Sequence, residues 1–415
     1  MKIALLAIGN ELLNGKTKDS NGQHLAQILN DFGFQLNAIH IAPDEKDDFR
    51  QLLDFCFQTY DIIITCGGLG PTLDDKTKNF LAEYFGKTIQ YSEQALEVVK
   101  KQYQRGERVY DEEKLSYHYL PESFTTLENT VGYAPGLSFS QDNKKLFALP
   151  GVPSEFAEMV KLHIIPQLID PHAQIKMKHV IVKTWKVPES KIFNEYVPNL
   201  WDKLAQYGEV SSLPHLLGVD IAVKLESNDE DQLKSHEQKI LELIQTSPLA
   251  EYIWHIGPES IEQVIINEAS QKNLTIGFSE SCTGGLCASR LTDISGSSQV
   301  FWGSVVSYAN EVKMKSLSVS SQTLKQFGAV SEQTALEMAK GARAHLDVDI
   351  AISTTGIAGP GGGSEEKPVG TVGIGFATEK NSGSKIYQFK GSREVLKRRF
   401  SEKALMTLLE IIRGF

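Results

Sequence analysis

The residues with the clearest chemical potential lie in the segment Ser279–Gly285, whose sequence is Ser-Glu-Ser-Cys-Thr-Gly-Gly. The apolar run Leu274–Phe278 before it predicts a buried strand, and the segment Leu286–Leu291 after it predicts a helix. This order would place the hydroxyls of Ser281 and Thr283 beside the unpaired N–H groups of a helix N-terminus, which bind anions. Serine and threonine are also ordinary helix caps, so this segment alone leaves both interpretations open.

Two segments further along the chain favour a ligand site. A strand is predicted at Phe301–Tyr308, and Asn310 and Lys313 follow it closely. The later segment Gly356–Gly363 is too rich in glycine to pack a core, and an alternating strand pattern resumes at Val369. Because the regular pattern returns so abruptly, we expect the glycine-rich loop to contact a ligand closely rather than to act as a linker.

These motifs together resemble the C-terminal domain of the CinA family, the nicotinamide-nucleotide amidases, over about residues 260–415. The resemblance implies that this domain hydrolyses nicotinamide mononucleotide to nicotinate mononucleotide and ammonia without a metal. It assigns catalytic roles to Ser281, Tyr308, Lys313, Thr355 and Arg393. It places the remaining matched residues at the substrate, namely Thr283, Gly284, Gly285, Gly356, Gly359, Gly361 and Arg398.

Hydrolysis of an amide needs a nucleophile, a base that activates it, donors for the oxyanion and a proton for the leaving ammonia. Ser281 is the candidate nucleophile, and the absence of histidine from the motifs argues against a Ser-His-Asp triad. Lys313 or Tyr308 would then serve as its partner, although a lysine at the start of a helix is most often a surface residue. Cys282 is the rival nucleophile, because a thiolate attacks more readily than a hydroxyl. Arg393, with Arg398 as an alternative, would hold the substrate phosphate.

The N-terminal part of the chain alternates strands with helices. The continuous apolar run Lys2–Ile8 is typical of a strand covered on both faces, and Asn37–Ile41 and Asp61–Thr65 are predicted as further strands. Ser20 and Asp44 are expected to cap the helices that lie between these strands. Such alternation predicts a parallel sheet with right-handed crossovers.

Three predicted strand ends in this part carry glycines and carboxylates. Ligands of parallel sheets bind beyond the carboxyl ends of the strands, and Mg²⁺ prefers oxygen ligands and bridges to substrate phosphates. We therefore expect a site there for a phosphate ester held through a divalent cation. Asp74 and Asp75 could instead begin the next helix, where acidic residues favour the helix dipole.

The motifs IGNELLNG, GGLGPTLDDKT and PGVPSE around these strand ends resemble the CinA N-terminal domain, which is similar to molybdopterin-binding domains. The resemblance implies an ADP-ribose pyrophosphatase that requires Mg²⁺, Mn²⁺ or Co²⁺, with potassium left open as a second cation. It places Asn10, Gly67, Gly68, Gly70, Thr72 and Gly151 at the substrate. The metal would be bound by carboxylates, namely Glu11, Asp74, Asp75 and Glu155.

Between these two regions the strand patterns Val180–Trp185 and Val219–Leu225 predict a small α+β module. It resembles the KH-like middle domain of CinA proteins, yet it lacks the GxxG loop of a KH domain that binds RNA. We therefore interpret it as a spacer or assembly domain. The fold class expected is α/β with three domains, at residues 1–172 (molybdopterin-binding-like), 173–254 (KH-like) and 255–415 (amidase).

Composition limits the possible partners. The chain has 415 residues and a net charge of −10, which argues against a nucleic-acid surface despite the basic run Lys397–Arg399. Four cysteines without metal spacing, no signal peptide and no apolar run of membrane length favour a cytoplasmic protein without a membrane partner. A homodimer that acts on nicotinamide mononucleotide and ADP-ribose is expected. The alternative is a non-enzymatic pterin- or nucleotide-binding protein, or a protein associated with competence.

Overall fold

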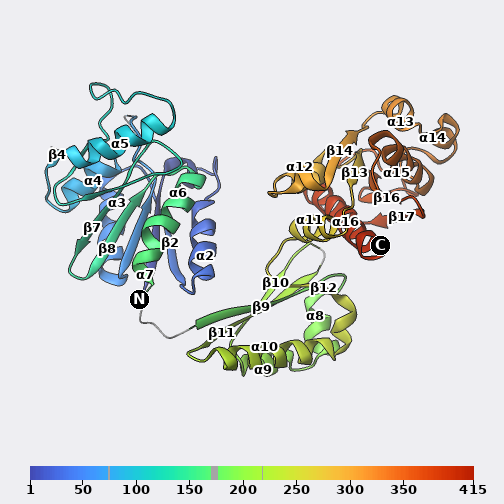
Figure 1. Ribbon diagram of the computed structural model, residues 1–415, viewed down its shortest axis with the longest axis horizontal. Helices are drawn as coiled ribbons and strands as arrows, with labels where there is room; N and C mark the ends of the chain where they lie inside the picture. The colour runs from blue at the N-terminus through green and yellow to red at the C-terminus, as the bar shows by residue number, and fades with distance from the viewer. Residues whose placement is uncertain (73–74, 170–175, 217) are drawn as a thin grey trace. The chain divides into compact units, whose positions relative to one another are not determined.

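The computed structural model describes residues 1–72, 75–169, 176–216 and 218–415. The chain forms two compact units, one of residues 1–177 with 226–233 and the other of residues 178–225 with 234–415. Figure 1 shows the order of the elements along the chain. The chain combines helices with several sheets in the expected α/β class, and the division into three domains stays a prediction.

The first unit is built on a six-stranded sheet of order β2-β1-β3-β8-β7-β6. Four neighbouring strands are parallel: β2 (Leu36–Ala42), β1 (Ile3–Ile8), β3 (Ile62–Cys66) and β8 (Lys144–Leu149). Two antiparallel strands complete the sheet: β7 (Gly136–Gln141) and β6 (Thr125–Leu127). A separate pair consists of β4 (Ile89–Tyr91) and β5 (Tyr119–Pro121). The predicted parallel core is therefore confirmed.

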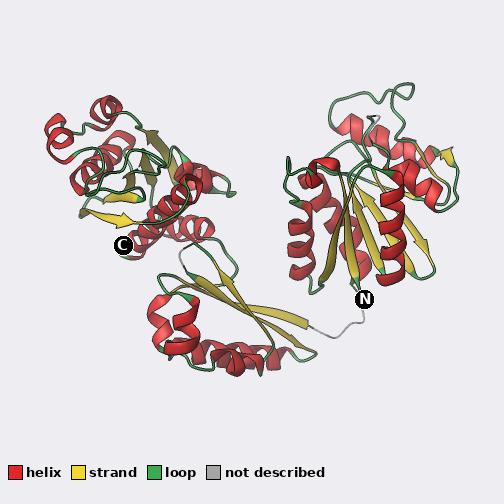
Figure 2. Cartoon of the chain, turned by 180° about the vertical axis from the view of Figure 1, so that it is seen from behind, coloured by secondary structure: helices red, strands yellow, loops and turns green. Residues whose placement is uncertain are grey.

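Helices cover both faces of this sheet (Figure 2). One face packs against α2 (Asn21–Asp31), α6 (Pro153–Met159) and α7 (Ile165–Leu168). The other packs against α3 (Lys46–Thr59), α4 (Thr77–Tyr84) and α5 (Glu93–Arg105). Strand β1 is fully buried, with Leu5 in the first core and Leu6 in the second, because successive strand residues point to opposite faces. This explains why β1 is continuously apolar.

The expected caps of two helices differ from those observed. Ser20 precedes α2 but its side chain makes no capping bond, and the Asp19 carboxylate instead accepts the N–H of Gly22 at 3.0 Å. Glu45, not Asp44, is the N-cap residue of α3. The Asp44 carboxylate accepts the N–H of Asn10, the first residue of the short helix α1 (Asn10–Leu13) that follows β1, at 2.9 Å. The acidic residue after β2 therefore ties two strand ends together.

Most of the four-stranded sheet β10-β11-β9-β12 belongs to the second unit. Its strands are β10 (Glu209–Pro214), β11 (Val219–Ser227), β9 (Lys176–Thr184) and β12 (Ile253–Ile256). The helical segments accompanying it are α8 (Glu189–Lys191), α9 (Leu200–Ala205) and α10 (Glu230–Gln245). The predicted α+β character of this region is confirmed.

The five-stranded sheet β14-β13-β15-β16-β17 carries the last part of the chain. Strands β14 (Phe301–Val306), β13 (Ile276–Glu280) and β15 (Ile350–Gly356) are parallel. Strands β16 (Thr371–Ala377) and β17 (Ser382–Gln388) are antiparallel. One face packs on α11 (Ile261–Gln271), α12 (Leu286–Thr292) and α16 (Arg393–Arg413). Near the opposite face lie α13 (Asn310–Leu317), α14 (Ser321–Phe327) and α15 (Glu332–Leu346).

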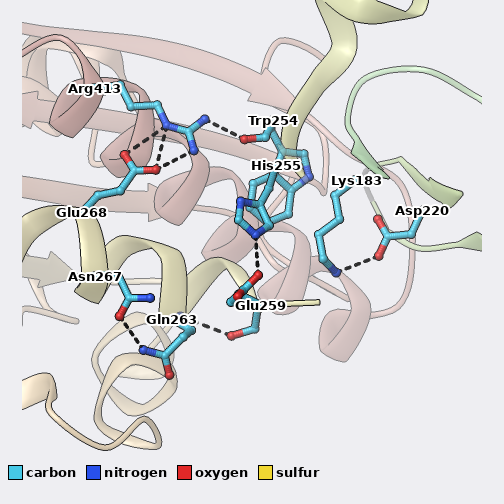
Figure 3. Close-up of polar contacts among 10 residues, drawn as sticks. Lys183, Asp220, Trp254, His255, Glu259, Gln263, Asn267, Glu268 and Arg413 are labelled. Carbon is cyan, nitrogen blue, oxygen red and sulfur yellow. Dashed lines mark hydrogen bonds and ion pairs between the residues drawn. The ribbon is translucent and has the colours of Figure 1, made fainter. Parts of the chain in front are cut away.

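Polar contacts fix the end of α16 against its surroundings (Figure 3). The Arg413 guanidinium forms an ion pair with Glu268 of α11 at 2.7 Å and donates to the carbonyl of Trp254 in β12 at 2.7 Å. Nearby, His255 hydrogen-bonds the Glu259 carboxylate at 2.7 Å. The last turn of the C-terminal helix is thus bound to both a helix and a strand that precede it by well over a hundred residues.

Within the described residues, no helix combines the length and the apolar character needed to cross a bilayer. All four cysteines are free and buried, at positions 56, 66, 282 and 287. Each of the four belongs to a hydrophobic core.

Candidate active sites

Ser281 lies in a tight turn between β13 and α12, as the sequence predicts. Its N–H donates to the carbonyl of Thr354 at 2.9 Å, and its own carbonyl accepts the N–H of Gly284 at 3.1 Å. Gly284 and Gly285 both have left-handed backbones, with φ of 65° and 95°. Residues with a Cβ rarely adopt such angles, so the two glycines allow the chain to reverse directly after the serine.

Lys313 reaches Ser281 from the neighbouring helix α13. Its side chain is buried, with only 1% of the residue exposed, so the surface role common for lysines does not apply. The Nζ atom lies 3.0 Å from the Ser281 hydroxyl, 2.7 Å from the carbonyl of Ser307 and 3.2 Å from the carbonyl of Tyr308. Three polar partners therefore surround a single buried amine.

The surroundings of Lys313 make its ammonium easier to deprotonate. Burial lowers the pKa of the ammonium, and the nearby Cys282 offsets only part of this effect. A neutral amine has two N–H donors and one lone pair. In the structure Nζ donates to two carbonyls and to the Ser281 hydroxyl, and once the amine has lost a proton its lone pair can accept the Ser281 proton instead. The arrangement can therefore activate Ser281 as a nucleophile.

Cys282, the rival nucleophile, also lines the cavity beside Ser281. Its thiol is buried, and burial raises its pKa to about 12. A thiol with such a pKa remains protonated at neutral pH, and the thiolate is the nucleophilic form. These surroundings favour Ser281 over Cys282.

The cavity next to Ser281 has a volume of about 210 Å³. Tyr308 is 65% exposed at its edge, and its hydroxyl accepts from Arg393 at 3.3 Å. Arg393 also donates to the carbonyl of Gly359 at 2.6 Å, so it ties the glycine-rich loop to the start of α16. Thr355 lines the cavity and donates to the carbonyl of Ala329 at 2.7 Å. All five predicted catalytic residues meet at this cavity.

Several predicted substrate residues lie elsewhere. Gly356 lines the cavity, but Thr283 is buried and its hydroxyl pairs with that of Thr354 at 2.7 Å. Arg398 is largely exposed and forms an ion pair with Glu394 at 3.4 Å. The remaining glycines shape loops without lining the cavity, namely Gly284, Gly285, Gly359 and Gly361.

The N-terminus of α12 is not free to bind a ligand, in contrast to the expectation from sequence. The buried carboxylate of Glu280, which immediately precedes the nucleophile, accepts N–H groups of the first turn.

Lys397 on α16 is a second residue that sequence reasoning missed, since its ammonium lies close to Gly284. Only its spacing of four residues from Arg393 could have indicated that both occupy one helix face.

A larger cavity of about 540 Å³ lies at the carboxyl ends of β1, β3 and β8. The predicted residues that line it are Glu11, Gly67, Gly68, Gly70, Asp75, Gly151 and Glu155. Asn10 and Thr72 do not line it, and Asp74 lies outside the described residues. The predicted meeting of three strand ends at one site is therefore observed.

The carboxylates of this cavity have different surroundings. Asp75 precedes α4 rather than beginning it, and it accepts the N–H of Thr72 at 2.9 Å within a turn. Glu155 accepts from the Asn129 amide at 2.6 Å, while burial raises its pKa. Burial and the nearby charges of Asp75 and Glu155 raise the pKa of Tyr117, which also lines the cavity. Asp75 and Glu155 therefore act on the same part of the cavity.

Sequence reasoning missed four acidic or aromatic residues of this cavity, Asp19, Asp44, Tyr117 and Tyr133. The position of Asp44 after β2 is a signal that could have placed it there. Among the described residues, no three or more His, Cys, Asp or Glu side chains gather as a ready metal site. Mg²⁺ needs only one or two protein carboxylates when substrate phosphates complete its shell, so these residues fit such an ion.

Two family models match the chain. Residues 258–412 match the CinA C-terminal domain, and residues 4–170 match the family described as "Probable molybdopterin binding domain". A CinA-like protein of Chloroherpeton thalassium is 35% identical over 420 residues, which cover 99% of each chain. The chain belongs to the CinA family.

A second relative of full length agrees with that assignment. A CinA-like protein of Kosmotoga olearia is 35% identical over 421 residues and covers all of this chain and 98% of its own. The crystal structure of the competence/damage inducible protein CihA from Agrobacterium tumefaciens is 40% identical. It covers 36% of this CinA protein and 92% of its own chain, with a TM-score of 0.36.

Proposed function

We propose that the C-terminal region of this CinA protein hydrolyses the carboxamide of nicotinamide mononucleotide, giving nicotinate mononucleotide and ammonia. The observation that carries the proposal is the pairing of Ser281 with the buried amine of Lys313 at 3.0 Å. A hydroxyl beside an amine with a lowered pKa is the arrangement needed to attack an amide carbon.

In this mechanism the Ser281 oxygen bonds to the carboxamide carbon while its proton passes to the neutral Lys313 amine. The C–N bond then breaks, and ammonia leaves with the proton that Lys313 returns. Water, deprotonated by the same amine, hydrolyses the resulting ester and restores the serine. Each step uses one base in both directions, so the site needs no histidine.

The size and charge of the surroundings support a substrate with one reacting end inside the cavity. The cavity of about 210 Å³ is smaller than the roughly 300–1,000 Å³ of sites that enclose a whole ligand. Arg393 lies at its edge, where a guanidinium can pair with phosphate. The nicotinamide ring would enter the cavity while the phosphate stays near the start of α16.

For the N-terminal region we propose metal-dependent cleavage of ADP-ribose to AMP and ribose 5-phosphate. The cavity of about 540 Å³ with Glu11, Asp75 and Glu155 on its wall supports a phosphate ester bound with a divalent cation. When bound, that cation would neutralise the diphosphate, and these carboxylates would hold it. The rival is a domain that binds a pterin or nucleotide without reaction.

The experiment measures ammonia release from nicotinamide mononucleotide and AMP release from ADP-ribose by the purified full chain. Activity on the first compound that Ser281→Ala abolishes is the expected result for the amidase. A protein that binds both nucleotides and turns over neither would favour the non-enzymatic alternative.

A further inference from the structure

Glu280 is the last residue of β13 and immediately precedes the proposed nucleophile. It is fully buried, with 0% of its surface exposed, and the chemistry proposed above does not use it. Its two carboxylate oxygens accept four hydrogen bonds at 2.9–3.3 Å, from the backbone N–H groups of Gly285, Cys287 and Ala288 and from the hydroxyl of Ser304. The Glu280 carboxylate is therefore fully hydrogen-bonded within the turn and its neighbouring strand.

Three of the four donors are backbone N–H groups at the start of α12. The first N–H groups of a helix have no partner inside the helix and form a site for anions. Glu280 occupies that position at α12 from within the protein. The N–H groups of Gly285, Cys287 and Ala288 are thereby satisfied within the protein.

The same contacts close the nucleophile turn into a ring. The backbone leaves Glu280, passes through Ser281, reverses at two left-handed glycines and returns to the Glu280 side chain at Gly285. Ser304 of β14 adds a contact from the neighbouring strand. The Glu280 side chain thus helps to set the position of the Ser281 hydroxyl relative to Lys313, although it hydrogen-bonds to neither of these side chains.

We propose that Glu280 is the positioning residue of this site: it holds the turn so that the Ser281 hydroxyl meets the Lys313 amine. The part of the proposal that concerns turnover rests on the proposed amidase function. The part that concerns the reactivity of Ser281 does not, because a sulfonyl fluoride reports on an activated serine without the natural substrate.

The test is Glu280→Gln in the full chain. The amide is isosteric, but its NH₂ group must face N–H donors and loses the bonds there. We expect phenylmethanesulfonyl fluoride to label Ser281 about 10²-fold more slowly, the loss typical of a 1 Å misplacement, and kcat to fall in parallel with little change in KM. If the wild type is labelled at Ser281 but does not hydrolyse nicotinamide mononucleotide, the amidase function is rejected. The difference in labelling rate between the wild type and Glu280→Gln still decides the positioning role.

Glu262→Gln is the matched control. Glu262 of α11 is also a largely buried carboxylate, and it binds Arg290 on the same helix α12 at 2.6 Å, away from the turn. This variant should lower the melting temperature without slowing the labelling of Ser281. If labelling of Ser281 slows equally in both variants, Glu280 only stabilises α12 as Glu262 does, and the proposal is overturned.

Ser304→Ala covers the case in which Glu280→Gln fails to fold. It removes one of the four donors and adds none, so the fold should persist while labelling of Ser281 slows to a smaller, measurable extent. Unchanged labelling in Ser304→Ala together with an unfolded Glu280→Gln variant, or wild-type labelling in a folded Glu280→Gln variant, would also overturn the proposal.

Discussion

Replacing Lys313 tests whether its neutral amine activates Ser281. Lys313→Arg places a guanidinium in the cavity, which does not release its proton near neutral pH and cannot accept one from the serine. Lys313→Met removes the amine and keeps the length of the side chain. A positioned general base contributes about 10²–10⁴-fold, or about 2.7–5.4 kcal/mol at about 1.36 kcal/mol per tenfold change, so both variants should lose activity by that amount.

The pH dependence gives a second measure of the same group. Because burial lowers the pKa of Lys313, its neutral fraction grows as the pH rises toward and past that value. The kcat/KM for ammonia release should therefore rise with pH in the wild type, with its midpoint below the ordinary lysine value of about 10.4. Ammonia release followed between about pH 6 and pH 10 reports this arm directly.

Replacing Lys313 should change stability and activity in opposite senses. The folded state binds the Lys313 proton more weakly than the unfolded state, so this group lowers stability at neutral pH and the loss diminishes as the pH rises. Lys313→Met removes that cost and should melt no lower than the wild type while being inactive. An active Lys313→Met or Lys313→Arg variant, or a rate that falls as the pH rises over this range, would refute the assignment of Lys313 as the base.

Three further outcomes follow from the two cavities. Ser281→Ala should abolish ammonia release and Cys282→Ala should retain most of it. An active Ser281→Ala variant with an inactive Cys282→Ala variant would exchange their roles. Arg393→Met should raise the KM for nicotinamide mononucleotide more than Arg398→Met does, because Arg398 is exposed and paired with Glu394; equal KM values would remove the phosphate role. EDTA should stop AMP release from ADP-ribose and spare ammonia release, whereas loss of both activities would contradict two chemically separate sites.

The sequence was sufficient to predict the parallel core of the first unit and the strand, turn and helix around Ser281. Hydrophobic periodicity and glycine-rich turns determine these features locally, and they require no knowledge of distant residues. Ser281 and Lys313 lie on different elements of the chain, so local patterns could not show that they are in contact. Only the family motif predicted this pairing.

Side-chain partners were less predictable. Thr283 was expected at the cavity but pairs with Thr354 beneath the turn, and an acidic residue such as Glu280 after a strand gives no local sign that it will bind a helix N-terminus. Asp44 was expected to cap α3, but its carboxylate accepts the N–H of Asn10. Each of these contacts joins elements that approach only when the sheet is assembled, so local propensity does not contain them.

Helix α16 has a consequence for where an independent C-terminal fragment can begin. Its first residue, Arg393, binds the glycine-rich loop at the cavity, and its last, Arg413, donates to the carbonyl of Trp254 (Figure 3). A fragment cut at the start of the matched family segment, residue 258, would lack that carbonyl and leave one end of a helix of about 30 Å without a strand anchor. A self-sufficient fragment should therefore begin upstream of Trp254, so that the strand supporting the far end of the helix travels with the site.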